Sequence, residues 1–176
     1  MIKVTVTGLD KLAATWGDIG AKLAFEMTQT NREVGEYLEE AVKKTIDMGG
    51  PGFPALSSRT VELKGHGKIL IDSGRFKDGI KHKVWAYHGE VFPTGSGYAS
   101  NDGRHIVRGK NATTYASTSG VALVHERGAV ISNGFGRGIT IRIPPRPVFL
   151  TTARREHKKV AAMYLRGVRR ALGFTV

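Results

Sequence analysis

An apolar stripe in the first third of the chain is the feature that most constrains the fold. Its side chains recur every three or four positions, at Leu9, Leu12, Trp16, Ile19, Leu23, Met27, Val34, Leu38, Ala41, Val42 and Ile46. This spacing predicts an α-helix from about Asp10 to Ile46, which at ~1.5 Å per residue would be more than ~50 Å long. The polar run 28–31 leaves open one helix or two collinear ones, and GGPGFP at 49–54 ends the pattern. An apolar stripe of this length packs partly against a neighbouring subunit or, more commonly, is buried under the protein's own sheet.

Short strand signals fill the middle of the chain. Alternating or β-branched segments predict strands at 2–6, 69–71, 80–92 with a turn near His88-Gly89, 121–124 and 139–143. Ser57 is placed to cap a short helical turn through Leu63, and a last helix is expected from about Phe149 to Leu172. Because the strands are contiguous, the fold class is α+β, an antiparallel or mixed sheet packed by the long N-terminal helix and the C-terminal helix. We expect one domain over 1–176, with 93–120 as an extended loop or hairpin arm.

The composition excludes several classes of protein. The chain has no cysteine, which rules out disulfides, thiolate chemistry and cysteine-ligated zinc. The N-terminal sequence MIKVTVTGLDKL lacks the apolar core of a signal peptide, and no apolar run approaches the ~20 residues that span a bilayer. We therefore expect a soluble protein made in the cytoplasm, with no membrane partner.

The net charge of +12 is unevenly distributed. Residues 1–47 hold six Lys and Arg against eight Asp and Glu, whereas residues 48–176 hold 21 against seven. Such a field attracts nucleic acid or an acidic protein. The candidate polyanion contacts lie in the arm and in the last helix: Arg104, Arg108, Lys110, Arg154, Arg155, Lys158 and Lys159.

Catalytic and metal-binding patterns are missing. The six histidines do not form an H-E-x-x-H pair, and the glycine-rich segments match neither nucleotide-binding fingerprint. His125-Glu126 is either an acid/base pair or, as we prefer, a polar cluster at a strand end where Gly128 supplies a positive φ. Asp72, Ser73 and His125 lack a nucleophile elbow. We expect no enzyme, no metal and no cofactor.

Three ordered segments resemble one protein family. ILIDSGRFKDGI at 69–80 is similar to the L-x-D-[ST]-G-x-L-x-x-S-I element of phage virion-morphogenesis and tail-completion proteins. VALVHERGAVI at 121–131 resembles that family's strand ending in H-x-x-G, and IRIPPRPVFL at 141–150 resembles its I-P-x-R-P-F-L segment before the last helix. PALSSRTVELKG at 54–65 resembles the family's lead-in. Phe76 stands where the family has leucine, Gly79 where it has serine, and 93–120 has no counterpart.

The resemblance implies a structural protein of the virion neck, made in the host cytoplasm. Such proteins form rings, commonly hexameric, around the DNA channel and bind the head connector or adaptor and the tail terminator or tail tube. DNA would pass through without sequence-specific contact. Interface candidates on the matching segments and beside them are Arg75, Phe76, Lys77, Lys81, His125, Arg127 and Arg146. A four-residue spacing predicts that Phe76 and Ile80 anchor a short helical turn in the core, with Arg75, Lys77 and Lys81 outside.

Three other functions remain open on the sequence. A tail terminator that caps the tail tube has a similar small α+β fold and also forms a ring. A stand-alone nucleic-acid-binding protein would explain the charge, although no known binding motif is present. A metal-dependent nuclease would need a carboxylate and histidine cluster that the sequence does not assemble.

Overall fold

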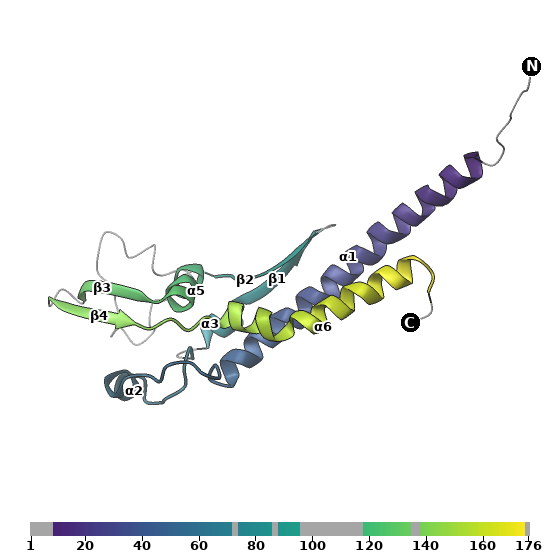
Figure 1. Ribbon diagram of the computed structural model, residues 1–176. Helices are drawn as coiled ribbons and strands as arrows, with labels where there is room; N and C mark the ends of the chain where they lie inside the picture. Colours follow the sequence, from purple (N-terminus) through teal and green to yellow (C-terminus); the bar gives the residue numbers. More distant parts are fainter. Residues whose placement is uncertain (1–8, 72–73, 86–87, 96–117, 135–137, 175–176) are drawn as a thin grey trace, which may run out of the picture. The chain divides into compact units, whose positions relative to one another are not determined.

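A computed structural model describes residues 9–71, 74–85, 88–95, 118–134 and 138–174 (Figure 1). Contacts divide the chain into two compact units. The helix-pair unit comprises Met1–Glu36, Lys83–Glu90 and His157–Val176, and the α/β unit comprises Tyr37–His82 and Val91–Glu156. The expected single domain over 1–176 stays a prediction.

The elements follow the order long helix, two short helices, two strands, a helix, two strands and a final helix. They are α1 (Leu9–Asp47), α2 (Ser58–Lys64), α3 (Arg75–Asp78), β1 (Ile80–Val84), β2 (Gly89–Pro93), α5 (Thr118–Arg127), β3 (Ala129–Gly134), β4 (Ile139–Ile143) and α6 (Val148–Ala171). Strands β1 and β2 form one two-stranded sheet, and β3 pairs antiparallel with β4 in another. The α+β class with a long N-terminal and a C-terminal helix is confirmed. No helix in the described ranges is long and apolar enough to span a membrane.

The ends of the helices follow local rules. Helix α1 is continuous through the polar run 28–31 and ends where Gly49 and Gly50 adopt φ of 74° and 62°. The Gly50 N–H donates to the Thr45 carbonyl at 2.9 Å, and a Cβ on Gly50 would lie 1.8 Å from the Phe53 ring, so glycine is required there. Ser57 caps α2 as expected, because its hydroxyl accepts a hydrogen bond from the Thr60 N–H at 3.2 Å.

Two of the predicted strands are wrong. Residues 121–124 lie in α5, where Ala122 is buried and the adjacent Leu123 is exposed. An apolar run this short has no period of its own, and contacts with the rest of the chain decide its structure. Residues 69–71 form a turn in which Leu70 has a φ of 61°, a left-handed conformation that a strand excludes. The predicted strand at 2–6 and most of the arm at 93–120 lie outside the described residues.

The remaining strand predictions hold. Segment 80–92 forms the pair β1 and β2, and 139–143 coincides with β4. Gly128 ends α5 with a φ of 73°, and a Cβ there would lie 2.8 Å from the Ile143 carbonyl oxygen. The positive φ that we expected at this position is therefore present, although it follows a helix rather than a strand.

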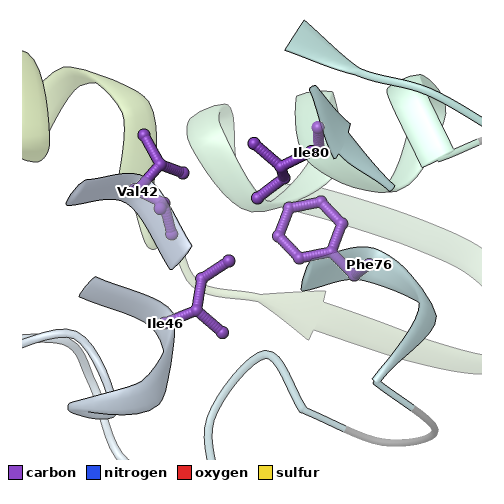
Figure 2. Packing of buried hydrophobic residues seen from close by; sticks show 6 residues of the cluster. Val42, Ile46, Phe76 and Ile80 are labelled. Atoms are coloured by element: carbon purple, nitrogen blue, oxygen red, sulfur yellow. The ribbon is translucent and has the colours of Figure 1, made fainter. Parts of the chain in front are cut away.

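One hydrophobic cluster forms the core of the α/β unit. Figure 2 shows Val42 and Ile46 from α1 facing Phe76 from α3 and Ile80 from β1. Ala122 and Val148 complete the buried set. The C-terminal part of the α1 stripe is therefore buried under the chain's own short elements. Burial within the chain, rather than against a neighbouring subunit, was the commoner of the two arrangements that the sequence left open.

The helix-pair unit is held by close contact between α1 and α6. A Cβ on Gly167 would lie 2.1 Å from the Thr30 hydroxyl oxygen, so the two helices approach where glycine leaves room. The Tyr164 hydroxyl donates to Asn31 Oδ1 at 2.8 Å. Arg170 lies 2.9 Å from a Glu26 carboxylate oxygen. The α1 stripe is thus interrupted by the polar residues Thr30 and Asn31 at the point where α6 packs on it through Gly167.

Candidate functional site

The segments that resemble the phage family meet in one place. Segment 69–80 contributes Phe76 and Ile80 to the core cluster, segment 121–131 contributes Ala122, and segment 141–150 contributes Val148. Phe76 and Ile80 are buried in the core as expected, but the predicted helical turn holds only Phe76, because α3 ends at Asp78 and Ile80 begins β1. These segments are more than 60 residues apart in sequence at their extremes, so their convergence is a property of the fold.

Arg146 ties two of these segments together. Its side chain is only 5% exposed, with Nε 3.1 Å from the Pro54 carbonyl oxygen and Nη2 3.3 Å from that of Ala55. Its backbone N–H donates to the His125 carbonyl at 2.5 Å. Burial lowers the pKa of the guanidinium from its ordinary value. The side chain is therefore hydrogen-bonded inside the unit, although we had named Arg146 as a candidate for contact with a neighbour.

His125 is a neutral side chain within the same region. Its ring meets Phe76 edge-on, with centroids 6.1 Å apart. Within the described residues its Nδ1 is buried without a hydrogen-bond partner. Burial, followed by the positive charges of Arg146 and Lys64, lowers the pKa of His125 to about 4. The imidazole therefore adds an uncharged ring to the core at neutral pH.

Glu126 acts separately from its neighbour. Its carboxylate accepts a hydrogen bond from the Phe149 N–H at 2.6 Å, at the start of α6. An acceptor at a helix N-terminus satisfies one of the free backbone donors and suits the helix dipole. The polar pair His125-Glu126 thus joins α5 to the start of α6. None of the contacts described here pairs the Glu126 carboxylate with the His125 imidazole, so they give no support to the acid/base interpretation.

The charged interface candidates separate into bound and exposed side chains. Lys77 lies 2.8 Å from the Asp47 carboxylate and is thereby held to the end of α1. Lys81 is mostly exposed, 4.0 Å from Glu39, and Arg127 is exposed at the end of α5. The side chain of Arg75 lies outside the described set. Among the expected interface residues described, Lys81 and Arg127 are the ones on the surface.

A charge cluster around Glu39 was not anticipated from the sequence. Its carboxylate lies 2.5 Å from Lys43 Nζ and 2.7 Å from His82 Nδ1, and the His82 N–H donates to it at 3.0 Å. Burial alone would raise the pKa of Glu39, but the hydrogen bonds from Lys43 and His82 outweigh it and lower the pKa to about 2. The i, i+4 spacing of Glu39 and Lys43 was the available signal. The contact with β1 was not visible in the sequence.

The polyanion candidates in α6 are exposed, as their charge requires. Arg154, Lys158 and Lys159 are on the surface. Arg155 is also exposed, with its Nε 2.6 Å from a Glu156 oxygen and its Nη2 3.0 Å from the Thr45 hydroxyl. Arg104, Arg108 and Lys110 lie outside the described residues. Among the candidate polyanion contacts, the structure therefore describes only those on helix α6.

No family model, curated protein or solved structure matches this chain. In the described ranges, no three histidines or carboxylates gather as a metal site would require. The functional assignment consequently rests on the motif segments, their convergence and the surface charge.

Proposed function

We propose that this chain is a structural virion protein of a tailed phage. It forms a ring at the junction of head and tail, commonly of six copies in the family it resembles. There it completes the tail and joins it to the head connector or adaptor. Its proposed role is assembly through surface contacts rather than catalysis.

The convergence of the motif segments is the observation that carries this proposal. The phage-like motifs contribute Phe76, Ala122 and Val148 to a single cluster, and Arg146 joins the lead-in at 54–55 to the proline-rich segment. The segments that carry the resemblance thus lie in one packed unit, as the parts of a single motif set would. The motif residues thus have one common role, which is to hold the α/β unit.

Surface charge supports contact with a polyanion or an acidic protein. The exposed basic residues of α6 occupy several successive turns, and the family's neighbours at the neck include DNA and ring proteins. A second candidate, a stand-alone nucleic-acid-binding protein, is favoured by the same helix. It predicts tight DNA binding by the isolated chain that weakens steeply with salt. Capping of the tail tube is the other assembly role compatible with these features.

Electron microscopy of particles made with and without this gene tests the proposal. Loss of the gene is expected to leave full heads separate from tails, and restoring it in trans should rejoin them. Unjoined tails of normal length indicate completion, and overlong tails indicate termination. Normal particles without the gene would contradict the virion assignment and leave salt-dependent DNA binding as the function to measure.

A further inference from the structure

Helices α1 and α6 carry different kinds of surface charge. In the described part of α1 the exposed side chains mix both signs, since cations such as Lys22 and Arg32 stand among acids such as Asp18, Glu33 and Glu36. On α6 every exposed ionisable side chain is a base: Arg154, Arg155, His157, Lys158, Lys159, Arg166, Arg169 and Arg170. A surface that presents one sign of charge along its length attracts a partner of the opposite sign.

Some charged side chains of α6 are bound within the chain. Glu156, which is the only acid in the α6 sequence, accepts a hydrogen bond from the Tyr37 hydroxyl and lies 2.6 Å from Arg155 Nε. Arg170 lies 2.9 Å from a Glu26 carboxylate oxygen on α1. These contacts occupy the acid of α6 and the cation that faces α1, so they leave the outward-facing cations to be explained.

Three cations of the helix-pair unit form what we call the outer basic face of α6. Lys158, Arg166 and Arg169 are exposed, and among the described residues none of them has an ion-pair partner. Lys158 and Arg169 are eleven residues apart, which is about three complete turns, so they lie on one face about 16 Å apart along the axis. Arg166 is three residues before Arg169 and lies beside it.

The outer basic face points away from α1. The buried residues Met163, Gly167 and Ala171 recur every four positions and form the covered side of α6. A Cβ on Gly167 would meet the Thr30 side chain, so this side is directed toward α1. Arg169 lies two residues after Gly167, about 160° around the helix axis from it. The three cations therefore have no part in packing α6 on α1.

Such a row of cations suits a phosphate backbone better than a protein surface. Protein interfaces have an apolar centre from which charged residues are depleted, and lysine is depleted from the interface as a whole. On the outer basic face the cations occupy the centre, and Leu165 is the large apolar side chain between Lys158 and Arg169. A basic stripe along a helix of a strongly basic chain is the electrostatic footprint of nucleic-acid binding, and the net charge here is +12.

We propose that the outer basic face of α6 binds the phosphate backbone of double-stranded DNA without reading its sequence. Phosphate contacts from lysine and arginine hold a protein on a duplex but carry no sequence information. The phosphates of one strand follow each other every ~3.4 Å along the duplex axis, so the face is about as long as five of them. This inference goes beyond the proposed assembly role, which does not require DNA binding by α6. An acidic protein partner is the alternative that the test separates from it.

Fluorescence anisotropy at several salt concentrations tests the site. A labelled duplex of mixed sequence is titrated with the full chain and with a triple variant that carries Lys158→Ala, Arg166→Ala and Arg169→Ala. Each phosphate contact contributes about 0.9 to the slope of log affinity against log salt, so the triple variant should lose about 2.7 of that slope. Between about 50 and 200 mM salt, the wild type should therefore lose about 40-fold more affinity than the variant.

A second triple variant controls for net charge. Lys22→Ala, Arg32→Ala and Lys44→Ala remove three exposed cations of α1, and with them the same total charge, but should leave the slope close to that of the wild type. Leu165→Ser should also leave it unchanged, because it lies on the outer basic face and carries no charge. Alanine favours helix at exposed positions, and circular dichroism checks that each variant keeps its helices.

Three results would overturn the proposal. Equal losses in the two triple variants would show that net charge alone explains the binding. An unchanged slope in the α6 variant would show that DNA does not contact this face. Binding of labelled polyglutamate as tight as that of the duplex would favour an acidic protein partner instead. The gene-deletion phenotype tests the proposed function separately, so the failure of one is distinguishable from the failure of the other.

Discussion

The two ends of helix α1 carry the same apolar stripe in different surroundings. At the C-terminal end, Val42 and Ile46 are enclosed by α3, β1 and the other members of the core cluster. At the N-terminal end, Trp16 is mostly exposed. Periodicity thus predicts which face of a helix is apolar, but it does not predict what covers that face.

The largest contrast between these ends is expected for aromatic truncation. Phe76→Ala removes a ring from a closed cluster and should lower the free energy of unfolding by about 3–5 kcal/mol. Trp16→Ala should change it by less than about 0.5 kcal/mol in the monomer, because its side chain loses few contacts. Urea titration followed by circular dichroism, at a concentration below that of assembly, measures both. Similar losses in the two variants would show that Trp16 is covered within its own chain.

A matched pair of glycine substitutions sharpens the comparison within the helix-pair unit. In Gly167→Ala the new methyl group would meet the buried Thr30 side chain, and about 1–3 kcal/mol should be lost. In Gly17→Ala nothing lies within 4 Å of the new Cβ, so higher helix propensity should stabilise the monomer by up to about 1 kcal/mol. Thermal unfolding of both variants is the measurement. Equal effects would contradict the close approach of α1 and α6 at Thr30.

The acid sensitivity of the α/β unit is expected in two adjoining pH windows. The pKa of His125 is about 4 in the folded chain against an ordinary 6.5, so the unfolded chain binds the proton more readily. Stability is therefore full above pH 6.5 and falls toward pH 4, by at most about 1.4 kcal/mol per pH unit for this one proton. His125→Gln should flatten this part of the profile.

The lower window belongs to Glu39. Its pKa is about 2 in the folded chain against 4.5, so its contribution is present above pH 4.5 and is lost as the pH falls toward 2. Glu39→Gln should remove the fall in that window and leave the His125 window unchanged. Urea midpoints measured from pH 7 to pH 3 distinguish the two groups. A profile that neither variant alters would contradict the environments assigned to them.

The long-range part of the fold was least accessible to sequence reasoning. Helices α1 and α6, strand β4 and the Ser57 cap were predicted because periodicity and local capping determine them. Segment 121–124 was assigned wrongly as a strand because four apolar residues do not distinguish a strand from a buried helical turn.

The site was predicted in part for the same reason. Phe76 and Ile80 were placed correctly in the core by their spacing alone. Arg146 was named as an interface candidate, yet it is buried against carbonyl oxygens 91 and 92 residues away in sequence. No local pattern marks an arginine for that position. The Glu39 contact with His82, 43 residues away, was missed on the same grounds.

Complementation of a gene-deleted phage tests the central claim most directly. The wild-type gene or an empty vector is supplied in trans, and the particles are counted as joined or unjoined by electron microscopy. The account predicts joined particles with the wild-type gene, and separate heads and tails with the empty vector. Joined, infectious particles with the empty vector would contradict the virion role.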